Sequence, residues 1–109
     1  ALLGDTNFEL YFLYNNMKER SKAKKYLKEA LRHYSKAISI APPQEEVKKL
    51  ELERGLNLFS PADLYRARGD VYSVNNKWYK ACKDWKVAKK YGDKEAEENI
   101  ITYFCFGNY

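Results

Sequence analysis

The chain has 109 residues, of which 45% are hydrophobic and 32% are charged, so it is long enough for one globular domain with a modest core and too short for two. Its 20 Lys and Arg against 15 Asp and Glu give a net charge of +5, which favours acidic partners weakly and does not by itself indicate nucleic-acid binding. No apolar run approaches the ~20 residues that span a bilayer. We therefore expect a soluble protein, and the sequence leaves open a cytoplasmic or a periplasmic location.

The sequence predicts helices throughout, because helix formers dominate and no stretch alternates apolar and polar residues for long. Pro42 and Pro43 end the second helix, since proline lacks the amide that a helix interior requires. Ser60 and Pro61 are typical of a helix start, and Gly92 suits a left-handed helix end. In chain order, the six expected helices cover residues 7–17, 21–41, 44–59, 61–74, 77–90 and 93–106.

Small and large residues alternate along one face of two of these helices, at spacings of 3, 4 and 3 residues. The alanines allow a neighbouring helix to approach, while a ring fills the gap beside them. We therefore predict helices that stack on one another. The members of this pattern are Leu27, Ala30, Tyr34 and Ala37 in the second helix and Trp78, Ala81, Trp85 and Ala88 in the fifth.

Residues 62–95 resemble the tetratricopeptide repeat, a helix-turn-helix unit of about 34 residues with the pattern W-x2-L-G-x2-Y, then A-x3-F, then P. Arg68 stands where the pattern has Leu, and Gly92 and Asp93 stand where it often has Pro. The stretch ACKDWKVAKKYGDKEAEENI is similar to the terminal repeat and capping helix of such proteins from Bacteroidota-type bacteria. The resemblance implies an all-α, right-handed helical repeat array. The matching positions are Tyr65, Gly69, Tyr72, Ala81, Trp85 and Ala88, with Tyr for Trp and Trp for Phe.

The resemblance also implies how a single domain over residues 1–109 is divided. Ala30, Tyr34, Ala37 and Pro42 match the second half of an earlier, degenerate repeat over residues 7–43. Ala81 follows Ala30 by about one and a half repeats, so one helix is inserted. We place the insertion at residues 44–59, the best-matching repeat at 62–95 and a C-terminal capping helix at 93–106. The sequence leaves open which helix partners the second one.

Members of the family bind peptides on the concave surface formed by the first helix of each pair. For this chain the resemblance implies a groove lined by Asp63, Arg66, Asp70 and Ser73, whose mixed charge matches a ligand with a basic group near an acidic one. Asp70 stands where members that bind chaperone tails need a neutral donor, so capture of a C-terminal carboxylate is not expected. Because we expect Arg66 to be exposed, Arg66→Glu should abolish partner binding and change stability by less than about 0.5 kcal/mol.

The sequence indicates neither a metal site nor a phosphate loop. Cys82 and Cys105 lie in no Cys-x-x-Cys pair or Cys/His cluster, and whether they are bridged to each other is left open. His33 is the single histidine and has no carboxylate four residues on, so we predict no metal and no cofactor. Gly69 has neither a second glycine nor a following Lys-Ser/Thr, and we interpret it as a site of close helix contact.

Two helices carry many basic residues beside their packing faces, which a solvated outer face explains and which a phosphate-binding face would also require. No nucleophile is paired with a base. We predict a non-catalytic scaffold that binds a peptide or a partner protein on its concave face or at the end of the stack, with an RNA-associated helical repeat as the alternative and self-association left open. The basic residues are Lys22, Lys24, Lys25, Lys28, Arg32 and Lys36, and Lys77, Lys80, Lys83, Lys86, Lys89 and Lys90.

Overall fold

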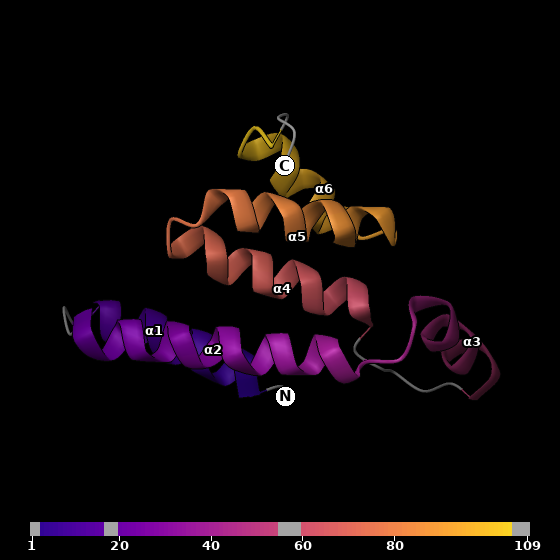
Figure 1. Ribbon diagram of the computed structural model, residues 1–109, viewed down its shortest axis with the longest axis horizontal. Coiled ribbons are helices and arrows are strands. Elements are labelled where there is room, and N and C mark those ends of the chain that lie inside the picture. The colour runs from indigo at the N-terminus through magenta and orange to yellow at the C-terminus, as the bar shows by residue number, and fades with distance from the viewer. Residues whose placement is uncertain (1–2, 17–19, 55–59, 106–109) are drawn as a thin grey trace.

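The computed structural model describes all residues except 1–2, 17–19, 55–59 and 106–109. The described residues form six α-helices and no strand, which confirms the expected all-α fold (Figure 1). None of the described helices is both long and apolar enough to cross a membrane. The helices are α1 (Leu3–Asn16), α2 (Arg20–Ile40), α3 (Gln44–Arg54), α4 (Pro61–Val74), α5 (Trp78–Lys90) and α6 (Lys94–Thr102).

The helices follow one another in packed layers. Figure 1 shows α1 with α2, then α4, α5 and α6 stacked in turn, with α3 set to one side. The helix α2 packs against both α1 and α4, so it has two partners where the sequence left its partner open. Two expected boundaries were wrong: α1 begins at Leu3 rather than at residue 7, and α6 ends at Thr102 rather than at residue 106. The last five residues of the expected third helix, 55–59, lie outside the described part of the chain.

Local hydrogen bonds define the start of α4, and residues with positive φ angles follow α4 and α5. The Ser60 hydroxyl accepts a hydrogen bond from the Asp63 amide at 3.3 Å, and the Asp63 carboxylate accepts one from the Ser60 amide at 3.2 Å, which forms a capping box with Pro61 at the first helical position. Asn76 and Gly92 follow α4 and α5 with φ angles of 57° and 94°. The predicted start at Ser60 and the predicted left-handed glycine are confirmed.

The alternating face of α5 forms the core between α4, α5 and α6. Ala81, Trp85 and Ala88 are buried, as the spacing predicted. A Cβ atom added to Gly69 would lie 2.7 Å from the Trp85 indole, so the glycine in α4 lets the helix approach the ring, as interpreted from the sequence. Trp78 is different: it is the first residue of α5 and is 42% exposed, although its ring packs against Tyr103.

The alternating face of α2 forms the core between α1, α2 and α4. Leu27, Ala30 and Tyr34 are buried, and Ala37 is partly buried. Gly4 makes the matching close approach here, because a Cβ atom at this position would lie 2.8 Å from the Tyr34 ring. Tyr34 also donates a hydrogen bond to the Asp5 carboxylate of α1. Each of the two predicted stripes therefore places one large ring against a glycine of a neighbouring helix.

The helix α3 and the C-terminal residues are attached to this stack in different ways. Val47 of α3 is fully buried, and Gln44 accepts a hydrogen bond from the Ala62 amide at 3.2 Å. Cys82 of α5 and Cys105 after α6 form a disulfide, which answers the question that their spacing left open. The disulfide, the buried Ala96 and the buried Ile100 hold α6 against α5.

Candidate binding site

The four residues predicted to line a groove bind other residues of the chain. Arg66 and Asp70 contact α6 or its cap, whereas Asp63 and Ser73 bind neighbours within α4 or at its cap. Arg66 makes ion pairs with Asp93 at 2.8 Å, with Glu95 at 3.3 Å and with Asp63 at 3.4 Å, and only a quarter of its side chain is exposed. Burial lowers the pKa of the Arg66 guanidinium, but the three carboxylates outweigh burial and raise it overall. Ser73 donates a hydrogen bond to the Asp70 carbonyl at 2.6 Å.

Asp70 links all three helices of the C-terminal half. Its carboxylate accepts hydrogen bonds from Trp85 Nε1 at 3.0 Å and from Asn99 Nδ2 at 3.1 Å. Burial raises the pKa of Asp70 to about 6, although the Trp85 donor and Arg66 favour the ionised form. The expectation that Arg66 is exposed was wrong, because its side chain is three-quarters buried and pairs with Asp93 and Glu95 at the start of α6. From these ion pairs we now expect Arg66→Glu to lower stability by more than the ~0.5 kcal/mol expected for an exposed position. Partner binding by Asp63, Arg66, Asp70 and Ser73 stays a prediction.

Replacing Asp70 with asparagine should stabilise the protein at pH 7. The folded pKa of about 6 lies above the ordinary value of 3.8, so the folded state binds the extra proton, and the Asp70 contribution to stability falls as the pH rises from about 4 to 6. The asparagine side chain would keep an oxygen for both donors, so we expect a gain of about 1–2 kcal/mol at pH 7, allowing for partial exposure. Urea unfolding of both proteins from pH 4 to 7 measures the difference, and a difference that is constant with pH would contradict the prediction.

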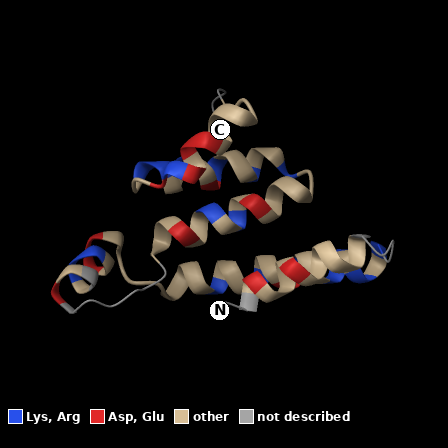
Figure 2. Ribbon diagram, turned by 180° about the vertical axis from the view of Figure 1, so that it is seen from behind, with Lys and Arg blue, Asp and Glu red and all other residues tan. Residues whose placement is uncertain are grey.

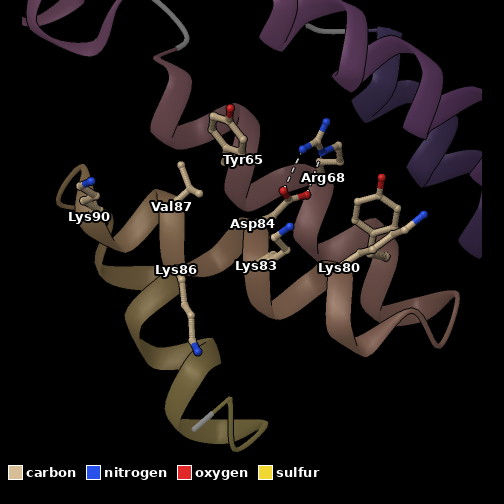
Figure 3. A pocket seen from close by; sticks show the side chains of 9 residues that line it. Tyr65, Arg68, Lys80, Lys83, Asp84, Lys86, Val87 and Lys90 are labelled. Carbon is tan, nitrogen blue, oxygen red and sulfur yellow. Dashed lines mark hydrogen bonds and ion pairs between the residues drawn. The ribbon is translucent and has the colours of Figure 1, made fainter. Parts of the chain in front are cut away.

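The other side of α4 faces an open cleft. Tyr65, Arg68 and Tyr72 recur at helical spacing on this side, and with α5 they border a cavity of about 540 Å³. We call it the α4–α5 cleft (Figure 3). The part of the cleft formed by α5 is lined by Lys80, Lys83, Asp84, Lys86, Val87 and Lys90.

A bidentate ion pair forms the centre of the cleft. Arg68 Nε and Nη2 donate to the two carboxylate oxygens of Asp84 at 2.7 Å and 2.8 Å, and Arg68 Nη1 donates to Ser35 Oγ of α2 at 3.3 Å. The hydrogen bonds to Asp84 raise the pKa of the Arg68 guanidinium above its usual range. The residue that departs from the leucine of the repeat pattern is therefore a partly buried connection between α4, α5 and α2.

Cations also cover the aromatic rings of the cleft. The Arg68 guanidinium lies 5.4 Å from the Tyr65 ring centroid and 5.8 Å from that of Tyr72, and Lys80 Nζ lies 5.6 Å from the Tyr72 centroid. Lys83 Nζ lies 5.5 Å from the Tyr79 ring. The cleft therefore combines exposed positive charge with rings that each have at least one cation over them.

The basic residues predicted on α5 fall into two groups, one that lines the cleft and one that does not. Lys80, Lys83, Lys86 and Lys90 line the cleft, whereas Lys77 and Lys89 do not. Figure 3 shows the Lys86 side chain extending toward α6, away from Tyr65. Acidic positions gather instead at the start of α6 (Figure 2). Asp84 is the single carboxylate among the described residues that line the cleft, and Arg68 pairs with it, so the cleft is strongly positive.

Comparison with models of protein families gives no match, and comparisons with curated proteins and with solved structures give none either. Among the described residues, no group of three His, Cys, Asp or Glu side chains is placed to hold a metal ion.

Proposed function

We propose that this chain is a non-catalytic protein-interaction module of the tetratricopeptide type, and that its α4–α5 cleft binds a segment of a partner protein. The observation that carries the proposal is an open cleft of about 540 Å³ that combines exposed lysines with apolar surface on two packed helices. The repeat assignment is supported by the positions of Gly69, Ala81 and Trp85, which pack against one another as the family pattern requires.

The cleft supports binding better than the groove predicted from the sequence. Arg66 and Asp70 are engaged with α5 and α6, so a ligand there would have to break existing ion pairs and hydrogen bonds. Lys80, Lys83 and Lys90 are exposed, and a ligand can reach them without such a loss. Arg68 Nε and Nη2 both donate to the Asp84 carboxylate. This pairing suits a structural role for Asp84 rather than acid or base catalysis.

An RNA ligand is the second candidate, because the cleft is positive and contains tyrosines. Proteins that bind single strands stack bases on open ring faces. Here Arg68 and Lys80 already lie over the rings of Tyr65 and Tyr72. A protein segment needs no such stacking surface, so the covered rings favour a protein partner.

Selection of random peptides on the immobilised chain tests the proposal. We expect selected peptides to lose at least about tenfold in affinity for Val87→Arg, which fills the cleft, and to bind Lys89→Glu within about twofold, because Lys89 lies on the same helix outside the cleft. Fluorescence anisotropy measures both. Thermal melts of the two variants show whether each is folded.

Peptides that bind Val87→Arg as well as the unmodified chain would place the site elsewhere. A 20-nucleotide poly-uridine RNA is the second probe in the same assay. Binding of this RNA that is tighter than that of every selected peptide and falls by about a thousandfold between 50 and 200 mM salt would replace the protein-binding proposal with RNA binding.

A further inference from the structure

The cleft has a fixed order of chemical groups along its length. The helices α4 and α5 form a hairpin, so Tyr72 lies beside Lys80 at one end and Arg68 pairs with Asp84 at the centre. Toward the other end, Figure 3 shows Val87 of α5 near Tyr65 of α4, followed by Lys90. Apart from Lys86, whose side chain extends toward α6, the order along α5 is therefore positive, neutral, apolar and positive (Figure 3).

Arg68, at the centre of the cleft, is already bound to other residues of the chain, so the lysines are the residues that recognise a ligand. Arg68 Nε and Nη2 already donate to Asp84 and Nη1 donates to Ser35, and only 20% of the Arg68 side chain is exposed, so a ligand carboxylate reaches the exposed lysines more readily than this arginine. Lysine ammonium groups act as point charges on flexible stems. They attract carboxylates without fixing their orientation, so ligand specificity must come from spacing along the cleft.

The spacing matches an extended chain. At about 1.5 Å of rise per helical residue, Val87 lies about 6 Å along α5 from Lys83 and Lys90 lies about 4.5 Å farther on. In an extended peptide, side chains two residues apart point to the same side and lie about 6.6 Å apart. An acidic residue, an apolar residue two positions later and an acidic residue two positions after that would face Lys83, Val87 and Lys90 in turn, with the lysine stems covering the small differences.

A helical ligand would need a different sequence to face the same residues. Its acidic, apolar and acidic side chains would have to lie three or four residues apart, because residues i, i+2 and i+4 of a helix do not share a face. The sequence of a bound peptide therefore distinguishes the two conformations of the ligand.

We propose that the α4–α5 cleft recognises an extended acidic segment of a partner protein, with acidic side chains at its first and fifth positions and a large apolar side chain at its third. This inference rests on the proposed function, because it assigns the ligand of the same cleft. Lys80 and Lys83 hold the first acidic group, Val87 receives the apolar group, and Lys90 holds the last acidic group.

Two peptides of identical composition test the inference. The first contains Glu-Ser-Leu-Ser-Glu and the second contains Glu-Leu-Ser-Ser-Glu, which turns the leucine to the opposite side of an extended chain. Titration of the ¹⁵N-labelled chain followed by NMR measures weak binding and identifies the amides that shift. We expect the first peptide to bind at least about fivefold more tightly and to shift the amides of Lys83, Val87 and Lys90.

Charge-reversal variants of the protein are the second part of this test. Lys83→Glu and Lys90→Glu should each weaken binding of the first peptide about tenfold, whereas Lys89→Glu, with the same change in net charge on the same helix, should weaken it less than about threefold. Equal affinity for the two peptides, or equal effects of the three reversals, would overturn the inference.

Failure of this inference can be told apart from failure of the proposed function. If selected peptides depend on Val87 but are not acidic, the cleft binds proteins and the assigned ligand is wrong. If acidic helical peptides with residues three or four apart bind more tightly than the extended design, the assigned conformation is wrong. If no selected peptide depends on Val87, both proposals fail.

Discussion

Replacing Trp85 with alanine is expected to lower the free energy of unfolding by about 3–5 kcal/mol, because the side chain is 1% exposed and its loss leaves a cavity between α4, α5 and α6. The substitution also removes the hydrogen bond to Asp70 and the stacking on Tyr103, whose ring centroid lies 5.4 Å away. Urea unfolding followed by circular dichroism measures the loss.

Trp78→Ala is the matched control for this prediction. Trp78 lies on the same face of α5 but is 42% exposed, so its removal leaves no closed cavity and should cost less than about 1.5 kcal/mol. Equal losses for the two tryptophans would mean that the burial of the α5 face does not determine stability as described.

Loss of the disulfide is expected to destabilise the protein by about 3 kcal/mol. Cys82 and Cys105 are 23 residues apart, and a closed loop of this length restricts the unfolded chain by about that amount. The double variant Cys82→Ala/Cys105→Ala should melt at a lower temperature than the oxidised chain. Dithiothreitol should lower the melting temperature of the unmodified chain to a similar value and leave the double variant unchanged. Melting curves of the unmodified chain that overlap with and without reductant would contradict the prediction.

Features set by neighbouring residues could be predicted from the sequence. The Ser60 cap, Pro61 and Gly92 depend on backbone chemistry within one turn of a helix, and the structure places them as expected. The buried faces of α2 and α5 follow from helical periodicity, which needs no knowledge of the partner helix. These local rules were sufficient for the order of the helices and for most of the core.

Features that depend on distant residues could not be predicted in this way. Arg66 and Asp93 are 27 residues apart in the sequence, and Arg68 and Asp84 are 16 residues apart. Neither ion pair therefore appears as a local sequence pattern. The mixed charge on one face of α4 was therefore interpreted as a binding groove. In the structure, Arg66 and Asp70 use this charge to contact residues of α5 and of α6 and its cap. The lysines of α5 and the departure of Arg68 from the repeat pattern were the available signals of the cleft, and their meaning required the positions of α4 and α5 relative to each other.

The order of the helices in the stack also bears on how the chain folds. Extensive contacts join α1 with α2, α2 with α4, α4 with α5 and α5 with α6, so each of these helices packs against those nearest to it along the chain. Structure can therefore begin in either hairpin, each of which closes a short loop, and spread to the other across the longer connection over residues 41–60 that contains α3. Such local topology is associated with folding in microseconds to milliseconds rather than seconds. In such a stack the stability of the fold is distributed over successive helix interfaces. A substitution at one interface should therefore destabilise the two adjoining helices first and the helices at the far end of the stack last.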